Sequence, residues 1–181
     1  LMFQVICNLL SNHLTLKPTL KFLKEKMYQS EHLNGNNEKR FSNKHVMNTL
    51  AVLLLNVSVQ IFRNDVDETG VELNDSICLD TVNLAKKLMK NSSDKAKKYL
   101  ASGKIGKSQI YLNISKKFYT TIQTCRIRMG NFDNNNEFKE EMNILTAIIL
   151  ELDSSWSDFV NIAESTVMVY EGKRMNKESK E

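Results

Sequence analysis

The sequence has few of the residues that interrupt helices. One proline and six glycines occur among its 181 residues, whereas a protein built from many short strands needs frequent turn residues. The longest uninterrupted apolar run extends only from Leu50 to Leu55, far short of the roughly 20 residues that a membrane-spanning helix needs. These absences favour a soluble protein of long helices over a many-turned β protein or a membrane span.

Cysteine is also scarce, and its spacing matches no known metal or disulfide pattern. Cys7, Cys78 and Cys125 form no CxxC pair, so neither a zinc site nor a disulfide framework is expected. Their apolar neighbours predict buried thiols in a reducing, intracellular compartment. The three histidines form no i, i+4 pair, and no Gly-x-Ser-x-Gly nucleophile motif occurs. We therefore predict a protein that is not an enzyme and that needs no metal or cofactor.

The chain is organised around the stretch from Ser42 to Phe62, which predicts one long helix. Ser42 or Asn43 can cap its free first-turn amides. Apolar residues cover most of the circumference, as is typical of a helix that is contacted from several sides in a core. One narrow polar stripe remains on this helix, made of these residues: His45, Asn48, Asn56, Gln60 and Arg63.

The rest of the chain predicts further helices joined by polar loops, because apolar residues recur at steps of three and four. The Thr and Tyr content of residues 108–129 also admits a strand. Gly172 can end the last helix, and the remaining residues 173–181 predict a charged, disordered tail. The expected helices cover residues 1–12, 18–30, 75–90, 108–129, 137–153 and 156–171, with a polar connection over 91–107. Because the chain begins inside an apolar helical pattern, we expect it to be a fragment of something longer.

The lysine-rich middle of the chain raises the question of anion binding. Ala101 to Ser108 fits a relaxed phosphate-loop pattern, but such a loop follows a buried strand, and the basic segment Lys95 to Leu100 does not predict one. Tyr99 is the only aromatic residue among the lysines of the stretch from Lys86 to Lys107. By default we interpret these lysines as a solvated face of the protein. The alternative is that they contact an anionic surface of a partner. The net charge of +4 is mild and does not demand nucleic acid.

Two asparagines suggest an internal repeat. Ile6-Cys7-Asn8-Leu9-Leu10-Ser11 resembles Leu54-Leu55-Asn56-Val57-Ser58, and the two asparagines are 48 residues apart. Units of about 40–47 residues are typical of armadillo and HEAT repeats, which stack into a superhelix with a concave inner surface. Each asparagine could bond the backbone of a peptide in that concave surface, or it could be bonded within the domain.

Ser42-Asn43-Lys44, followed by the apolar helix from Leu50 to Val59, resembles the PUL domain. This domain is found at the C-terminus of phospholipase-A-two-activating protein and its fungal counterparts. Val57 stands where the family pattern has an aromatic residue, and Gln4 stands where an arginine is expected before Asn8. The family domain is longer than this chain, so N-terminal repeats are expected to be missing here.

The resemblance implies an all-α fold, an armadillo/HEAT-like α-α superhelix (a right-handed helical solenoid), over residues 1–172. It also implies a non-catalytic adaptor that binds the acidic C-terminal tail of a hexameric AAA+ ATPase of the valosin-containing protein type. Such an adaptor acts in ubiquitin-dependent protein handling in the cytoplasm and the nucleus, with ubiquitin bound by regions outside this chain. Neither nucleic acid nor a membrane is an expected partner. The expected peptide-binding residues are Asn8, Asn56 and Lys44, helped by Asn12, His45, Gln60 and Arg63.

Two other functions remain open at this point. The first is a generic armadillo/HEAT scaffold for another peptide or protein. The second is an enzyme fragment whose active residues lie outside the chain.

Overall fold

The computed structural model describes residues 18–22, 25, 43–63, 75–129 and 136–178. Within these ranges the chain forms helices and no strand, so the all-helical prediction is confirmed and the strand alternative for residues 108–129 is wrong. None of the helices in these ranges is long and apolar enough to cross a membrane. The elements are α4 (Lys44–Arg63), α5 (Asp75–Ala101), α6 (Ile105–Met129), α7 (Asn136–Leu152), the 3-10 helix η3 (Ser154–Trp156) and α8 (Ser157–Glu178).

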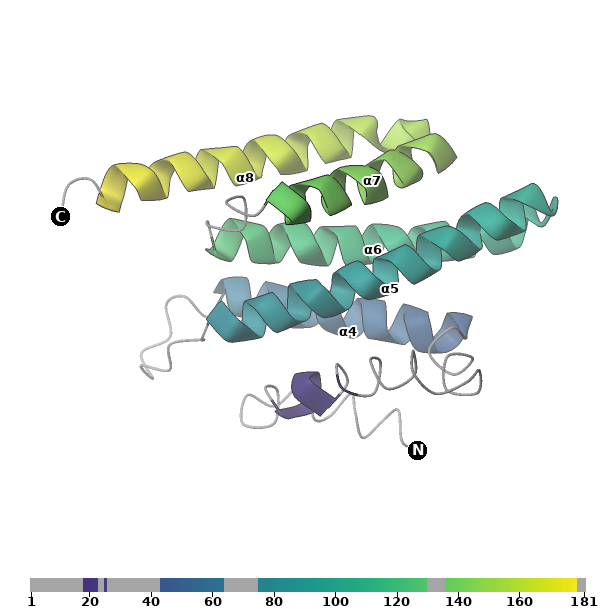
Figure 1. Cartoon of the computed structure of the whole chain (residues 1–181), viewed down its shortest axis with the longest axis horizontal. Coiled ribbons are helices and arrows are strands. Elements are labelled where there is room, and N and C mark those ends of the chain that lie inside the picture. The colour runs from purple at the N-terminus through teal and green to yellow at the C-terminus, as the bar shows by residue number, and fades with distance from the viewer. Residues whose placement is uncertain (1–17, 23–24, 26–42, 64–74, 130–135, 179–181) are drawn as a thin grey trace.

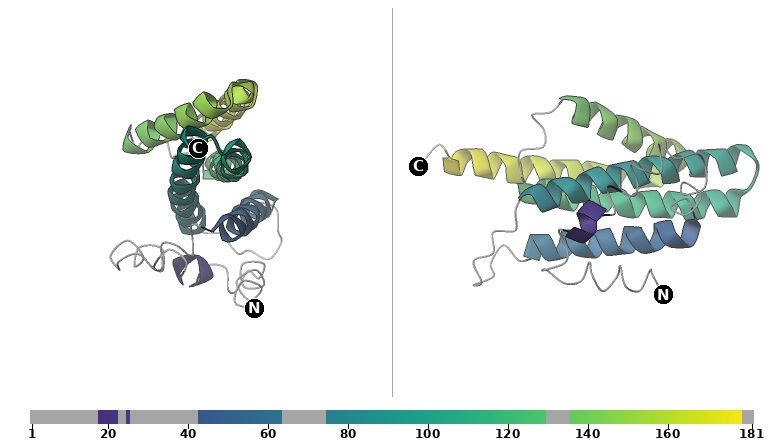
Figure 2. Two further views of the ribbon diagram at one scale, coloured as in Figure 1. Left: turned by 90° about the vertical axis from the view of Figure 1, so that its right-hand side faces the viewer. Right: turned by 60° about the horizontal axis from the view of Figure 1, so that its bottom comes forward.

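Successive helices alternate in direction. α4, α6 and α8 run one way and α5 and α7 run the other way (Figure 1). Viewed end-on, α4, α5 and α6 form one cluster, with α7 and α8 packed above it (Figure 2). The short links between α5 and α6 and between α7 and α8 account for this order there, because a short link leaves two neighbouring helices antiparallel.

The centre of the structure is α6, which contacts α4, α5, α7 and α8. Sequence reasoning instead expected the helix of residues 42–62 at the centre, contacted from several sides. The prediction failed for α6 because burial on most sides erases an amphipathic pattern. Its buried apolar residues include Leu112, Ile114, Phe118, Tyr119 and Ile122.

The start of α4 agrees with its prediction, whereas its burial is confined to one side of the helix and not to several. Oδ1 of Asn43 accepts a hydrogen bond from the amide of His45 at 2.9 Å, so Asn43 is a residue that caps the helix. One stripe of α4 is buried, containing Met47, Leu50, Ala51, Leu54 and Val57. The opposite side of α4 is exposed to solvent, as the 39 % exposure of Val52 between polar residues shows.

α5 extends eleven residues beyond its predicted end at Lys90, to Ala101. Residues 91–107 are polar and therefore predicted a connection, but the small polar side chains among them are buried against α6. Ser92 Oγ lies 2.6 Å from Ser115 Oγ, and Ser93 Oγ donates to Ser115 Oγ at 3.1 Å. Because serine side chains are small, the two helices approach each other closely. The serine hydroxyls form hydrogen bonds with each other across the contact, so none of these buried polar groups lacks a partner.

The turn between α5 and α6 is built on Gly103, which has a φ of 69°. The amide of Lys104 donates to the carbonyl of Tyr99 at 2.9 Å, and the amide of Gly103 donates to the carbonyl of Leu100 at 2.9 Å. These two bonds form a Schellman motif, which needs a residue in the left-handed region after the helix. The phosphate-loop pattern is therefore a helix-to-helix turn, preceded by a helix and not by a strand.

The last helix differs from its prediction at both ends. Asp153 caps η3, since its side chain accepts a hydrogen bond from the amide of Ser155. α8 then begins at Ser157 and continues through Gly172 to Glu178. The predicted end at Gly172 is wrong, and residues 173–178, predicted as part of a disordered tail, continue the helix. A glycine inside a helix costs only about 1 kcal/mol relative to alanine, which does not by itself end the helix.

Candidate functional site

Three helices meet at the turn between α5 and α6 and enclose a small pocket. The pocket has a volume of about 140 Å³ and is lined by Lys44, Tyr99, Lys107, Ile110 and Tyr111. Lys44 begins α4, Tyr99 lies in the last turn of α5, and the other three belong to the first two turns of α6. We call this site the tyrosine–lysine pocket.

The two tyrosines of the pocket stack on each other across the helix pair. Their ring centroids are 5.5 Å apart with an interplanar angle of 18°. Lys107 of α6 places its Nζ 5.7 Å from the ring centroid of Tyr99 in α5. In the opposite sense, Lys95 of α5 places its Nζ 5.3 Å from the ring centroid of Tyr111 in α6. Each helix thus supplies a lysine to the tyrosine of the other, a cation–π arrangement that holds both ammonium groups beside the pocket.

The charged residues that line the pocket are positive. Lys44 and Lys107 line it, and Lys95 Nζ lies 5.3 Å from the ring centroid of Tyr111. Lys44 and Lys107 are exposed at the pocket. Burial, followed by the neighbouring Tyr99, raises the pKa of Tyr111 above its ordinary value. The arrangement can attract and hold an anion, and it contains no nucleophile–base pair.

The predicted peptide-binding residues are placed on different sides of α4. Lys44 lines the pocket, while His45 and Asn56 are exposed. Asn56 follows Lys44 by twelve residues, which is about 18 Å along a helix and about a third of a turn around it. The structure therefore does not bring Lys44 and Asn56 into one compact site. Gln60 and Arg63 belong to α4, but their side chains lie outside the described part, as do Asn8 and Asn12 entirely.

Sequence reasoning missed the pairing of Tyr99 with Tyr111, although the sequence holds a signal for it. The pattern Lys-x-x-x-Tyr occurs at Lys95–Tyr99 and again at Lys107–Tyr111, on either side of the Gly103 turn. In a helical hairpin, positions at equal distances from the turn lie opposite each other, so Tyr99 faces Lys107 and Tyr111 faces Lys95, which brings the two rings close together. Sequence reasoning did identify the polar stripe of α4. One residue of this stripe, Asn48, accepts a hydrogen bond from Lys117 of α6 at 2.7 Å.

Among the described residues, no group of three or more His, Cys, Asp or Glu side chains could hold a metal ion. No family model, curated protein or solved structure matches the chain.

Proposed function

We propose that the chain is a non-catalytic binding module for an acidic peptide and that the tyrosine–lysine pocket anchors this peptide. The observation that carries the proposal is the stacked pair Tyr99–Tyr111 with a lysine over each ring, beside the exposed Lys44. An aromatic side chain of the peptide would enter the pocket, whose volume of about 140 Å³ is close to that of a cavity known to hold benzene. Neighbouring carboxylates of the peptide would pair with Lys44 and Lys107.

The resemblance of Ser42-Asn43-Lys44 and the helix after it to the PUL domain suggests which peptide this is. In that family the partner is the C-terminal tail of a hexameric AAA+ ATPase of the valosin-containing protein type, which is acidic and carries a near-terminal aromatic residue. The chemistry of that tail is complementary to the pocket, because its aromatic residue would fit the small pocket beside Tyr99 and Ile110 and its acids suit the lysines. The chain would then be an adaptor in ubiquitin-dependent protein handling, with ubiquitin bound elsewhere in the full protein.

The alternating helices are compatible with an armadillo/HEAT-like right-handed superhelix, and we include this architecture in the proposal. From the pocket, an extended peptide of about six residues would reach from Lys44 to Asn56 along the open side of α4. It would pass His45 on the way. This path retains the predicted contacts to Asn56 and His45, and Gln60 and Arg63 would follow on the same helix.

Single-stranded nucleic acid is the main competing anion, and the geometry disfavours it. Such ligands stack their bases on exposed aromatic faces. Tyr111 is only 6 % exposed, and its ring is stacked on Tyr99 with Lys95 nearby. A carboxylate-rich peptide needs only the ammonium groups and the small pocket, so it fits better.

The proposal is tested by titrating a fluorescent tail peptide into the wild-type chain and into Lys44→Ala and Lys107→Ala, with Lys139→Ala as control. Lys139 is an exposed lysine of α7 outside the pocket. Each pocket variant should weaken binding about three- to tenfold and reduce its salt dependence, as loss of one charge pair at an interface does. Equal affinity in all four proteins would refute the pocket, and an unrelated acidic peptide binding as tightly as the tail would favour the generic scaffold.

A further inference from the structure

The turn that joins α5 to α6 forms a tip that projects from the molecule. In two views this helical hairpin extends beyond the ends of α4, α7 and α8 (Figures 1 and 2). Every residue from Leu100 to Lys107 is exposed. We call residues 98–107 the α5–α6 tip. Because the tip projects, it can reach an extended surface before the other described helices do.

Large aliphatic side chains lie unpacked at the tip. Ile105 is 70 % exposed, the highest value among the large apolar side chains of the described residues, and Leu100 is 46 % exposed. In a Schellman motif the apolar contact that often closes the turn is made by the second residue after the C-cap. Here that residue is Lys104, whose amide bonds the carbonyl of Tyr99. The turn therefore does not use Ile105, whose apolar surface stays available to a partner.

The same tip carries positive charge. Lys98, Lys104 and Lys107 belong to it, and its sequence contains no aspartate or glutamate. Lys98 and Lys104 are exposed, and neither forms an ion pair with a carboxylate of the described residues. Lys97, just before the tip, is instead paired with Glu151 at 2.6 Å.

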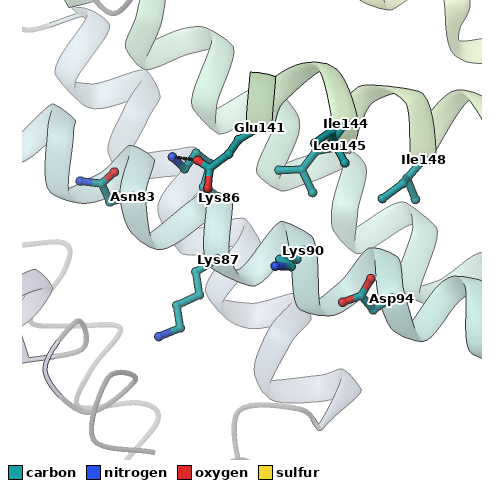
Figure 3. A pocket seen from close by; sticks show the side chains of 9 residues that line it. All are labelled: Asn83, Lys86, Lys87, Lys90, Asp94, Glu141, Ile144, Leu145 and Ile148. Carbon is teal, nitrogen blue, oxygen red and sulfur yellow. Dashed lines mark ion pairs between the residues drawn. The ribbon is translucent and has the colours of Figure 1, made fainter. Parts of the chain in front are cut away.

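The lysines further back on α5 do not add to this excess. In the cavity between α5 and α7, Lys86 is paired with Glu141. Lys87 points away from that cavity, and Lys90 lies one turn from Asp94 (Figure 3). The positive excess on α5 is therefore concentrated at the tip, where the exposed aliphatic side chains also lie.

We propose that the α5–α6 tip binds the surface of an anionic lipid membrane. Ile105 and Leu100 enter the interface between headgroups and acyl chains, and Lys98 and Lys104 pair with the anionic headgroups. Aliphatic side chains together with lysines are typical of segments that lie in such an interface. The lysines draw the protein to the negative surface, and the aliphatic side chains gain free energy by leaving water. This proposal takes up the anionic surface that the lysine-rich stretch left open, and it replaces the expectation that no membrane is a partner.

Other anionic partners fit the tip less well. An acidic protein would need a concave apolar recess to cover the aliphatic side chains of a projecting turn, whereas a bilayer accepts them without one. Single-stranded nucleic acid stacks its bases on exposed aromatic faces. The only aromatic residue of the tip is Tyr99, which is half-buried and stacked on Tyr111.

The test measures co-sedimentation of the full chain with lipid vesicles. Vesicles of phosphatidylcholine with about 30 % phosphatidylserine are compared with vesicles of phosphatidylcholine alone. The chain should bind the anionic vesicles about tenfold tighter or more, and added salt should weaken this binding. Ile105→Ser should weaken it about tenfold, and Lys104→Glu should weaken it about fivefold or more.

Ile162→Ser and Lys139→Glu are the matched controls and should bind like the wild type. Ile162 is 64 % exposed in α8. Lys139 is exposed near the start of α7, at the end of the bundle away from the tip (Figure 1). Circular dichroism and thermal unfolding establish that each variant is folded, which the exposure of all four side chains favours.

Three results would overturn the proposal. The first is no binding to the anionic vesicles, which is also the result expected if an acidic protein is the partner. The second is equal binding to both kinds of vesicle, and the third is a loss in Ile105→Ser or Lys104→Glu no larger than in its control. The test contains no peptide, so its failure would leave the peptide-binding proposal standing, and the failure of that proposal would not affect vesicle binding.

Discussion

Nη1 of Arg126 in α6 lies 3.0 Å from both carboxylate oxygens of Glu164 in α8. Glu164 also accepts hydrogen bonds from Gln123 Nε2 at 2.6 Å and from the Tyr119 hydroxyl at 3.3 Å. Arg126, Gln123 and Tyr119 are all buried, so one glutamate of α8 satisfies three polar groups of the central helix. This polar contact fixes the position of α8 more specifically than its weakly patterned apolar residues could.

Replacement of Glu164 by alanine should therefore destabilise the protein. We expect a loss of about 2–3 kcal/mol in the free energy of unfolding, measured by urea denaturation. This is less than the full effect of breaking a buried pair, because the Glu164 side chain is 35 % exposed. Glu151→Ala is the control, since its pair with Lys97 is exposed and should contribute below about 1 kcal/mol. Equal losses in the two variants would contradict this account of α8.

The same contact predicts how stability depends on alkaline pH. Burial, followed by the charge of Glu164, raises the pKa of Tyr119 to about 12. The folded state therefore retains the phenol proton at a pH where the unfolded chain, with a tyrosine pKa of about 10, has lost it. This contribution is fully present below pH 10 and is lost as the pH rises toward 12.

The free energy of unfolding of the wild type should thus fall between pH 10 and 12, and Tyr119→Phe should remove part of that slope. Tyr170→Phe, at an exposed tyrosine of α8, serves as control and should leave the slope unchanged. Parallel curves for the wild type and Tyr119→Phe would show that the Tyr119 proton makes no such contribution.

The buried cysteines should be inert toward alkylation. Cys78 and Cys125 are buried and are not joined in a disulfide, and their burial was predicted from their apolar neighbours. A hydrogen bond with Cys78, followed by burial, raises the pKa of Cys125 well above its ordinary value. Because the thiolate is the reactive form, a Cys7→Ser variant treated with iodoacetamide at pH 7.5 should gain no mass when folded. The same variant should gain two adducts in urea, and rapid alkylation without urea would contradict the buried arrangement.

Two glycines at the α5–α6 turn should respond oppositely to alanine. Gly103 has a φ of 69°, and an added Cβ there would meet nothing within 4 Å, so Gly103→Ala should cost about 1 kcal/mol through backbone strain alone. Gly106 lies in the first turn of α6 with equally open space around it. Gly106→Ala should therefore stabilise the protein by about 0.5–1 kcal/mol. The two melting temperatures should move in opposite directions, and a shift of the same sign in both would refute the Schellman motif.

The helices that were predicted best are those with one buried side. α4 and α7 keep apolar residues at steps of three and four, and their bounds are close to the predicted ones. The second half of α5 could not be predicted, because Ser92 and Ser93 resemble loop residues until Ser115 is known to face them. Gly172 was predicted to end the last helix, but the helix continues through it. A glycine ends a helix only where the rest of the chain turns away, and the local sequence does not show where that happens.

The candidate site was predictable only in part. Lys44 was selected through a family resemblance, and it lines the pocket. Tyr99 and Tyr111 become neighbours only when the turn at Gly103 pairs α5 with α6. Asn56 was selected through its spacing from Asn8 and Lys44 through the resemblance, but the helical period places Asn56 and Lys44 on different sides of α4. The projection of the α5–α6 tip depends on how far the other helices extend in space, which a periodicity analysis cannot detect.

The central claim is that the aromatic residue of an acidic tail peptide enters the tyrosine–lysine pocket, and a double-mutant cycle tests it most directly. Binding of the peptide and of its aromatic-to-alanine form is measured by calorimetry with the wild type and with Ile110→Ala. Ile110 lines the pocket and is 41 % exposed, so the variant should stay folded. We predict a coupling energy of about 0.5–1.5 kcal/mol between the peptide aromatic and Ile110, and none with Ile162→Ala. Additive losses with Ile110→Ala, or a well-folded chain that binds neither peptide, would contradict the account.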